Sequence, residues 1–382
     1  MSIVRVAWDF QAITGPRPTG LGMSVGLLLK AFEDHCAQHT VIPLRPNETN
    51  SALVDVPDRM KWEQWRLPNA VRRIHPRASL LYSPALGAPL KCALPVVAHV
   101  HDLIPLIFPE QFHGPSGFYW KQMLPRSWKR ARIITVSNAA VKRDIMRILD
   151  YPAERIHVVP YYPDPSWRIH AQQIREQAAR DENPLGPTAE PVFLMLASHE
   201  VRKNIELAIQ ALAELKQRHG MAARLVCIGG HSEHTPVLQS IAAELGVQDS
   251  LELPGYLSQD EITERLLNCT ALLFVSRYEG YGMPPQEAQS IGVPVVLSDI
   301  ACHKEVYADR DRISQLATDL QFAPPMVDTG NHRKLADHMH KLATDPDWRE
   351  LLGRHGIAYS GTFSSRRTAT ALLEAFEAAL VR

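Results

Sequence analysis

The feature that most constrains the fold is a regular alternation of short apolar runs with segments of helical periodicity. Runs such as Ile3–Ala7 and Ile133–Val136 are separated by stretches such as Met23–Phe32, whose apolar residues recur at helical spacing. The same alternation resumes at Val192–Ala197. Strands that alternate with helices predict parallel sheets covered on both faces, so we expect an α/β fold.

A polar stretch separates two such series. Residues 170–190 carry many charges and end in a run rich in Pro and Gly, which is typical of a linker. We predict Rossmann-like domains over residues 1–168 and 191–364, joined by a linker over 169–190. The amphipathic segment 365–382 is predicted to form a helix that packs back on the first domain. Ligands are then expected in a crevice between the domains, at the carboxyl ends of the strands.

Composition places the chain among ordinary globular proteins, with 45% hydrophobic and 21% charged residues. Lys+Arg and Asp+Glu are both 41, so net charge indicates no class of partner, and we expect no nucleic acid. The five cysteines are scattered without a C-x-x-C pair, which argues against disulfides and zinc. No signal-peptide pattern and no apolar run of about 18 residues occurs, so we expect a cytoplasmic protein.

The segment Ser276–Leu297 carries the strongest chemical signal. A predicted strand leads into the loop Glu279–Gly282, and a helix with two early prolines should begin near Met283. Glycines permit close backbone approach to a ligand, and the free N–H groups of a helix start bind a diphosphate. Glu287, in the early helix, could accept hydrogen bonds from the two hydroxyls of a ribose. A glutamate there can equally be only a partner for the helix dipole.

This segment resembles the E-x7-E signature of retaining glycosyltransferases of family 4, which have the GT-B fold. The signature runs here from Glu279 to Glu287. The resemblance implies that the first glutamate contacts the donor sugar and that the second holds the nucleotide ribose. It also implies that loop amides meet the diphosphate or the sugar, at Gly280, Tyr281, Gly282 and Met283. Tyr281 stands where the family often has Phe.

Further stretches extend the resemblance over nearly the whole chain. The stretch AWDFQAITGPRPTGLGMSVG matches the family's first strand, glycine loop and helix, so Gly20 and Gly22 are expected to approach the donor sugar and phosphates. VVAHVHDLIPLIF matches the strand that ends in a His-Asp pair, which makes His101 the histidine near the transferred sugar. A lone histidine at a strand end more often has a structural role, and His99 is expected to be such a residue.

Two cations follow the first strand of the second predicted domain. Lys203 matches the lysine with which family members hold the donor diphosphate, and Arg202 is adjacent. Many relatives carry a further cation in a Gly-Arg pair, where this chain has Ala197-Ser198. We therefore expect Arg202 to take over that role, because cations placed there can neutralise the leaving group. A solvated Arg-Lys pair at a helix start is the alternative.

The resemblance implies retention of anomeric configuration without a metal ion. We find no D-x-D pair with neighbouring acids that would hold Mg²⁺ against a diphosphate, so cations and helix N–H groups are expected to neutralise it. No cofactor is expected besides the donor substrate. GDP-mannose is suggested for that donor by overall resemblance to bacterial mannosyl- and rhamnosyltransferases, and by no specificity residue. Front-face displacement and double displacement both remain open.

The region 121–147 is basic and contains a tryptophan, with another at its edge. Its single acid is Asp144, while its cations are Lys121, Arg126, Lys129, Arg130, Arg132, Lys142, Arg143 and Arg147. Together with Trp120 and Trp128, such a face can meet anionic lipid headgroups, or it can simply be solvated. The first interpretation predicts a peripheral protein on the inner face of the membrane, with a lipid-linked glycan as acceptor.

The sequence thus favours a retaining hexosyltransferase that uses a nucleotide diphosphate donor and a glycan or lipid-linked acceptor in cell-surface polysaccharide or lipopolysaccharide synthesis. One alternative is a GT-B epimerase or hydrolase that acts on the nucleotide sugar itself. Another is a non-catalytic subunit that only binds a nucleotide sugar. The presence of both Glu279 and Glu287 argues against this last alternative.

Overall fold

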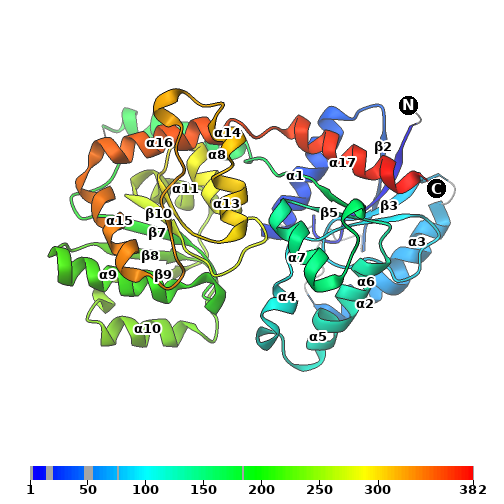
Figure 1. The fold of residues 1–382 in the computed structure, drawn as a ribbon, viewed down its shortest axis with the longest axis horizontal. Coiled ribbons are helices and arrows are strands. Elements are labelled where there is room, and N and C mark those ends of the chain that lie inside the picture. Colours follow the sequence, from blue (N-terminus) through cyan, green and yellow to red (C-terminus); the bar gives the residue numbers. More distant parts are fainter. Residues whose placement is uncertain (1–2, 14–19, 47–54, 75–76, 183–184, 382) are drawn as a thin grey trace. The chain divides into compact units, whose positions relative to one another are not determined.

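The protein contains two compact units, each with its own sheet (Figure 1). The computed structural model describes residues 3–13, 20–46, 55–74, 77–182 and 185–381. One unit comprises Met1–Tyr162 with Phe363–Arg382, and the other comprises Pro163–Thr362. Each sheet has six strands, and every strand pair among the described residues is parallel. The predicted α/β class with two parallel sheets is therefore confirmed.

The sheet of the first unit has the strand order β2-β1-β3-β4-β5-β6. All four residues of β3, β4 and β5 are buried, as expected for central strands of a parallel sheet that is covered on both faces. The strands are β1 (Arg5–Asp9), β2 (Thr40–Leu44), β3 (Leu80–Ser83), β4 (Val96–His99), β5 (Ile133–Val136) and β6 (Ile156–Val158).

The helices of the first unit include several short ones between β4 and β5. The sequence predicts a helix over Ser116–Ala131 that Pro125 should kink or interrupt. In the structure this region is helical with a π-helical turn at Tyr119–Met123, and Pro125 lies in the first turn of the α-helix that follows it. The helices are α1 (Gly20–His35), α2 (Val56–Lys61), η1 (Trp62–Arg66), α3 (Leu67–Ile74), α4 (Ile104–Ile107), η2 (Pro109–Gln111), α5 (Gly114–Phe118), η3 (Tyr119–Met123), α6 (Leu124–Arg130), α7 (Ala139–Leu149), η4 (Ala153–Arg155) and α17 (Ser365–Leu380).

Helix α17 belongs to the first unit although it lies more than 200 residues beyond β6 in the sequence. It packs against α1 and against strands β3 to β6 (Figure 1). The ring of Phe376 lies 5.0 Å from that of Tyr82, 5.4 Å from that of Phe32 and 6.4 Å from that of Trp8. These four rings are buried, so α17 completes the aromatic core of the first unit.

The sheet of the second unit has the order β12-β11-β10-β7-β8-β9, which makes β7 and β10 neighbours. Its strands are β7 (Val192–Leu196), β8 (Arg224–Ile228), β9 (Leu251–Gly255), β10 (Ala271–Phe274), β11 (Val295–Ser298) and β12 (Met326–Val327). Its helices are α8 (Ser166–Arg180), η5 (Val201–Lys203), α9 (Ile205–His219), α10 (Thr235–Glu244), η6 (Gln248–Ser250), α11 (Gln259–Asn268), α12 (Met283–Ser290), α13 (Ala301–Tyr307), α14 (Arg310–Ile313), η7 (Thr318–Leu320), α15 (His332–Thr344) and α16 (Pro346–Ser360).

The units divide the chain at different residues from the predicted domains. The first boundary between the units lies between Tyr162 and Pro163, ahead of the predicted linker 169–190. Much of that interval belongs to α8, which packs on α11 and α12. Trp167 and Ala171 of this largely polar helix are buried, and Trp167 donates to Glu287 of the second unit. Residues 183–184 of the predicted linker lie outside the described residues.

Candidate active site

The loop between β10 and α12 has the predicted form of a glycine turn that leads into a helix. Gly282 has φ +83° and caps α12, which begins at Met283 as predicted. A Cβ at Gly282 would lie 2.8 Å from Cε1 of Phe274, so both the backbone conformation and the packing require glycine. The Tyr307 hydroxyl donates to the carbonyl of Gly282, and Gln286 donates to the hydroxyl of Tyr281 over 3.0 Å.

Glu279 lies on this loop and pairs with both predicted cations. Lys203 Nζ donates to Glu279 Oε1 over 2.6 Å, and Arg202 Nη1 donates to the same oxygen over 3.3 Å. All three side chains are at most 13% exposed. Arg202 and Lys203 follow β7, and Glu279 follows β10. Because β7 and β10 are neighbours in the sheet, their carboxyl ends bring together Lys203 and Glu279, which lie 76 positions apart in the sequence.

Charge determines the protonation state of Glu279. Burial alone would raise the pKa of this carboxyl, but the charges of Lys203 and Arg202 and the hydrogen bonds from Lys203 and Ser276 outweigh it and lower the pKa to about 2. Glu279 is therefore ionised at neutral pH. A buried carboxylate of this kind persists because it is paired, and removal of its charge would take from Lys203 and Arg202 a carboxylate that both contact.

The backbone that carries the cations is held by Asn204. This residue has φ +58°, and its Nδ2 donates to the carbonyls of Val275 and Thr329 over 3.1 and 2.9 Å. The N–H of Arg277 donates to the carbonyl of Arg202 over 2.8 Å. The segment after β7 is thus joined directly to the segment after β10, independently of the charged side chains.

Glu287 lies on α12 and is 4% exposed. Burial raises the pKa of its carboxyl to about 8; the hydrogen bond from Trp167 lowers it, and the nearby charge of Asp164 raises it. At pH 7 this carboxyl is therefore mostly protonated, so it can both donate and accept a hydrogen bond. Glu279 and Glu287 thus have opposite protonation states at the two ends of the same motif.

His101 belongs to the first unit, where a chain of hydrogen bonds uses both of its ring nitrogens. Its Nε2–H donates to the carbonyl of Pro84 over 2.6 Å, so Nδ1 accepts from the hydroxyl of Tyr161 over 2.8 Å. Tyr161 in turn accepts from Nε2 of His99 over 2.8 Å. Burial lowers the pKa of His101 to about 4, so the ring is neutral at physiological pH. His99 is buried and held from both sides, as expected of a structural residue.

The sequence had suggested that Gly20 and Gly22 lie in a loop, but the structure places both in a helix. Both lie in the first turn of α1, which begins at Gly20. The hydroxyl of Ser24 donates to the carbonyl of Gly20 over 2.9 Å. Residues 14–19, the rest of the predicted glycine loop, lie outside the described residues.

Comparison with known proteins identifies the family. Residues 20–166 match the model described as Glycosyltransferase Family 4, and residues 177–359 match the model described as Glycosyl transferases group 1. Together the two matches span most of the chain, one in each half. The chain belongs to glycosyltransferase family 4.

Several curated relatives of this family 4 glycosyltransferase are mannosyltransferases. The serotype-specific mannosyltransferase WbdA of Escherichia coli is 28% identical over 303 residues, which are 77% of this chain and 34% of WbdA. This chain therefore spans about a third of WbdA. The O-antigen chain mannosyltransferase B of Escherichia coli is 24% identical over 329 residues, which are 81% of this chain and 80% of that protein.

Solved structures confirm the predicted GT-B fold. Anabaena HepE in complex with UDP and glucose has a TM-score of 0.65 at 14% identity and covers 97% of this chain and 98% of its own. WaaG, a glycosyltransferase involved in lipopolysaccharide biosynthesis, has a TM-score of 0.63 at 16% identity and covers 97% of this chain and 99% of its own.

One residue beside the site was not predicted from the sequence. His303 on α13 is fully buried, and its Nδ1–H donates to the carbonyl of Ser298 over 3.0 Å. Its Nε2 has no hydrogen-bond partner among the residues that the structure describes, and it lies 3.5 Å from the position that a Cβ on Gly282 would take. Burial lowers the pKa of His303 to about 4. No sequence pattern indicates this residue, because its position depends on how α13 packs beneath the loop.

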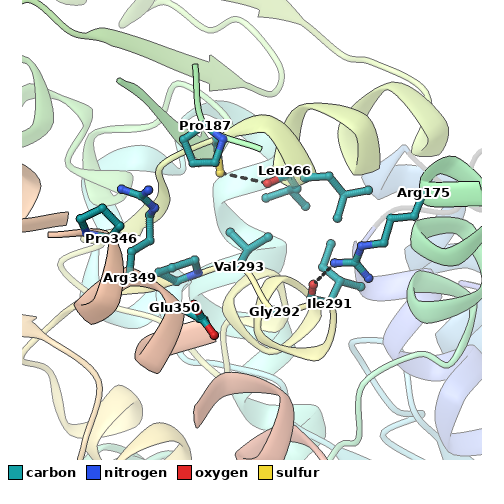
Figure 2. A pocket seen from close by; sticks show the side chains of 12 residues that line it. Arg175, Pro187, Leu266, Ile291, Gly292, Val293, Pro346, Arg349 and Glu350 are labelled. Carbon is teal, nitrogen blue, oxygen red and sulfur yellow. Dashed lines mark hydrogen bonds between the residues drawn. The ribbon is translucent and has the colours of Figure 1, made fainter. Parts of the chain in front are cut away.

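A cavity of about 290 Å³ lies elsewhere in the second unit (Figure 2). Arg175 and Arg349 flank it from opposite sides, and Val293 lies between them. The cavity borders the segments that precede β10 and β11, whereas Glu279 follows β10. None of the residues predicted for the active site lines it.

Two D-x-D triplets occur in the chain, and in both the first aspartate caps a helix. The side chain of Asp309 accepts from the N–H groups of Asp311 and Arg312, and that of Asp345 accepts from the N–H of Trp348. Among the described residues, no group of three His, Cys, Asp or Glu side chains is placed to hold a metal ion. In the same part of the chain, no helix is both long and apolar enough to cross a membrane.

The raised pKa of Glu287 predicts a pH dependence of stability. Between pH 5 and 8 the folded protein keeps a proton that the unfolded chain has lost, so its free energy of unfolding should fall as pH rises. Glu287→Gln should remove this contribution, which is at most about 1.4 kcal/mol per pH unit. Urea titrations at several pH values measure the difference between the two proteins.

The exposed Glu264 supplies the control for this comparison. Glu264→Gln should follow the wild-type slope between pH 5 and 8. If Glu287→Gln also follows it, Glu287 does not hold a proton in the folded state.

Proposed function

We propose that the protein is a retaining, metal-independent hexosyltransferase. It transfers mannose or a related sugar from a nucleoside diphosphate donor to a glycan or lipid-linked glycan during cell-surface polysaccharide synthesis. The observation that carries the proposal is the pairing of Glu279 with Lys203 and Arg202 beside the start of α12. The names of the mannosyltransferase relatives support the sugar and the pathway class.

The residues that we propose to bind the donor follow from the charges around Glu279. Lys203 and Arg202 would neutralise the diphosphate, helped by the N–H groups of Gly280, Tyr281, Gly282 and Met283 at the start of α12. Glu287 would bind the ribose hydroxyls. HepE, which has the same fold, was solved with UDP and glucose, and this supports a nucleoside diphosphate sugar as donor. GDP-mannose is the donor that we propose.

The mechanism follows from where charge develops. As the bond between the sugar and the diphosphate breaks, negative charge grows on the leaving phosphate and positive charge grows on the sugar. The two cations stabilise the former, and the ionised Glu279 stabilises the latter. The leaving phosphate can take the proton of the acceptor hydroxyl, which permits attack from the same face. We propose that neutral His101 and the helix start at Gly20 and Gly22 position the sugar and the phosphates.

The product of the reaction tests this proposal. With GDP-mannose and a mannose-containing acceptor, the anomeric configuration of the product should equal that of the donor, as measured by NMR. EDTA should leave the rate unchanged, because arginine, lysine and helix N–H groups supply the neutralising charge. An inverted product, or activity lost on chelation and restored by Mg²⁺, would contradict retention or metal independence respectively.

The same assay without acceptor separates the alternative activities. Rapid release or epimerisation of the sugar under these conditions would indicate a hydrolase or an epimerase in place of a transferase.

Glu279 is predicted to be essential for transfer. Glu279→Gln should lower kcat by at least about 10²-fold, because the charge opposite the developing positive sugar is lost. The variant should also be less stable by about 3–5 kcal/mol, since the buried Lys203 loses its carboxylate partner and Arg202 loses one of two. It should still bind GDP, because both cations remain, and a thermal shift with GDP reports this binding.

Glu279→Ala serves as a second variant, and Glu264→Gln serves as the control for a surface glutamate. Wild-type turnover by either Glu279 variant would refute the role that we assign to this residue.

A membrane surface is proposed on the first unit. Arg126, Lys129, Arg130, Arg143 and Arg147 are exposed in the region 121–147, and Phe118 just before it is 57% exposed. Trp128, which the sequence had suggested as part of this face, is buried, and its indole donates to the carbonyl of Leu86 over 2.8 Å. Trp120 is half-buried against the core, with the guanidinium of Arg59 5.6 Å from its ring centre. We propose that Phe118 supplies the exposed aromatic ring. Exposed cations together with an exposed aromatic ring suit anionic lipid headgroups.

Replacement of two of these cations tests the membrane surface. The double variant Lys129→Gln/Arg130→Gln should bind vesicles of phosphatidylglycerol and phosphatidylcholine roughly 30-fold more weakly, at about 1 kcal/mol per cation. Cosedimentation at low salt measures the partition coefficient. Arg366→Gln/Arg367→Gln, which removes the same charge from exposed positions of α17, should bind like the wild type. Equal loss in both variants would contradict a specific surface.

A further inference from the structure

A relay of side chains follows β7 and ends at Glu279. The hydroxyl of Ser198 donates to Glu200 Oε1 over 2.7 Å, and Arg202 Nε donates to Glu200 Oε2 over 2.8 Å. Arg202 Nη1 then donates to Glu279 Oε1 over 3.3 Å. The guanidinium of Arg202 is therefore held between two carboxylates, and each oxygen of Glu200 has its own donor.

The backbone and the side chains of this segment are held by separate interactions. Asn204 and the N–H of Arg277 hold the main chain of residues 201–204, as described above. The side chain of Glu200 is 39% exposed, while that of Arg202 is 12% exposed. Loss of the Glu200 carboxylate should therefore change the direction of the guanidinium and leave the backbone in place.

Such a contact matters because arginine has a long side chain with many rotamers. To hold its guanidinium in one direction costs conformational entropy, and a ligand that binds a loose arginine must supply that free energy. Where the side chain is already oriented, the ligand meets it without this cost. Lys203 is held differently: its Nζ binds Glu279 and lies 5.3 Å from the ring centre of Phe274.

We propose that Glu200 is a positioning residue, which orients Arg202 toward the diphosphate of the donor and is itself held by Ser198. The inference rests on the proposed function, because it assumes that a diphosphate binds at Arg202 and Lys203. Glu200 is a carboxylate and would repel a diphosphate directly, so any favourable contribution to diphosphate binding must come through Arg202. This favourable contribution should vanish when Arg202 is absent.

Binding of GDP and of inorganic pyrophosphate tests this proposal by calorimetry. Glu200→Ala should raise the Kd of both ligands by roughly 10-fold, the scale on which loss of an orienting partner weakens a site. Glu200→Gln keeps an acceptor for Arg202 and should lie between wild type and Glu200→Ala, as should Ser198→Ala. In transfer assays, KM for the donor should rise more than kcat falls.

A double-mutant cycle separates positioning from a general structural role. In an Arg202→Ala background, Glu200→Ala should change the Kd of pyrophosphate less than twofold. Glu252→Ala is the matched control. Like Glu200, Glu252 accepts hydrogen bonds from two donors, here the guanidiniums of Arg224 and Arg265, but it lies on β9, away from the proposed site. It should leave the Kd unchanged.

Two results would overturn the inference: an unchanged pyrophosphate Kd in Glu200→Ala, or an equal effect with and without Arg202. Should Glu200→Ala fail to fold, Glu200→Gln and Ser198→Ala carry the same test. If the wild-type protein binds neither GDP nor pyrophosphate, the proposed function itself fails, and that outcome is distinct from the other two.

Discussion

The candidate site in the second unit depends on one buried carboxylate that has two cationic partners. Glu279, Lys203 and Arg202 come from loops after neighbouring strands, and none of the three charges would be tolerated there alone. With Glu200 the four charges balance, so the cluster is ordered before any ligand arrives. The diphosphate that we propose as ligand would compete with two carboxylates for the cations.

The two glutamates of the motif show how position alone separates chemical roles. Glu279 faces cations and stays ionised, whereas Glu287 is buried near Trp167 and Asp164 and keeps its proton. The same residue type thus provides a charge at one end of the motif and a neutral hydrogen-bonding group at the other. Ionised and neutral carboxyls at neutral pH suit a developing cation and a pair of sugar hydroxyls respectively.

Sequence reasoning found what local pattern encodes. The glycine turn before Met283 and the parallel sheets follow from residue types at fixed spacing. It missed β12, which has two residues, and β2, which contains Pro43, because neither carries a usable periodicity. Glu200 and His303 were also missed, since their contacts depend on packing between distant segments. Gly20 was assigned to a loop because a glycine pattern does not show where a helix begins.

The position of α17 has a consequence for how the chain folds. Phe376 packs in a cluster whose other rings, those of Trp8, Phe32 and Tyr82, come from the first 82 positions. Pro163–Thr362 form the second unit in between. The second unit is in effect an insertion into the first. During synthesis the first sheet must therefore wait, with part of its apolar face uncovered, until some 200 further residues have left the ribosome. Early synthesis is the stage at which this enzyme should depend most on chaperones.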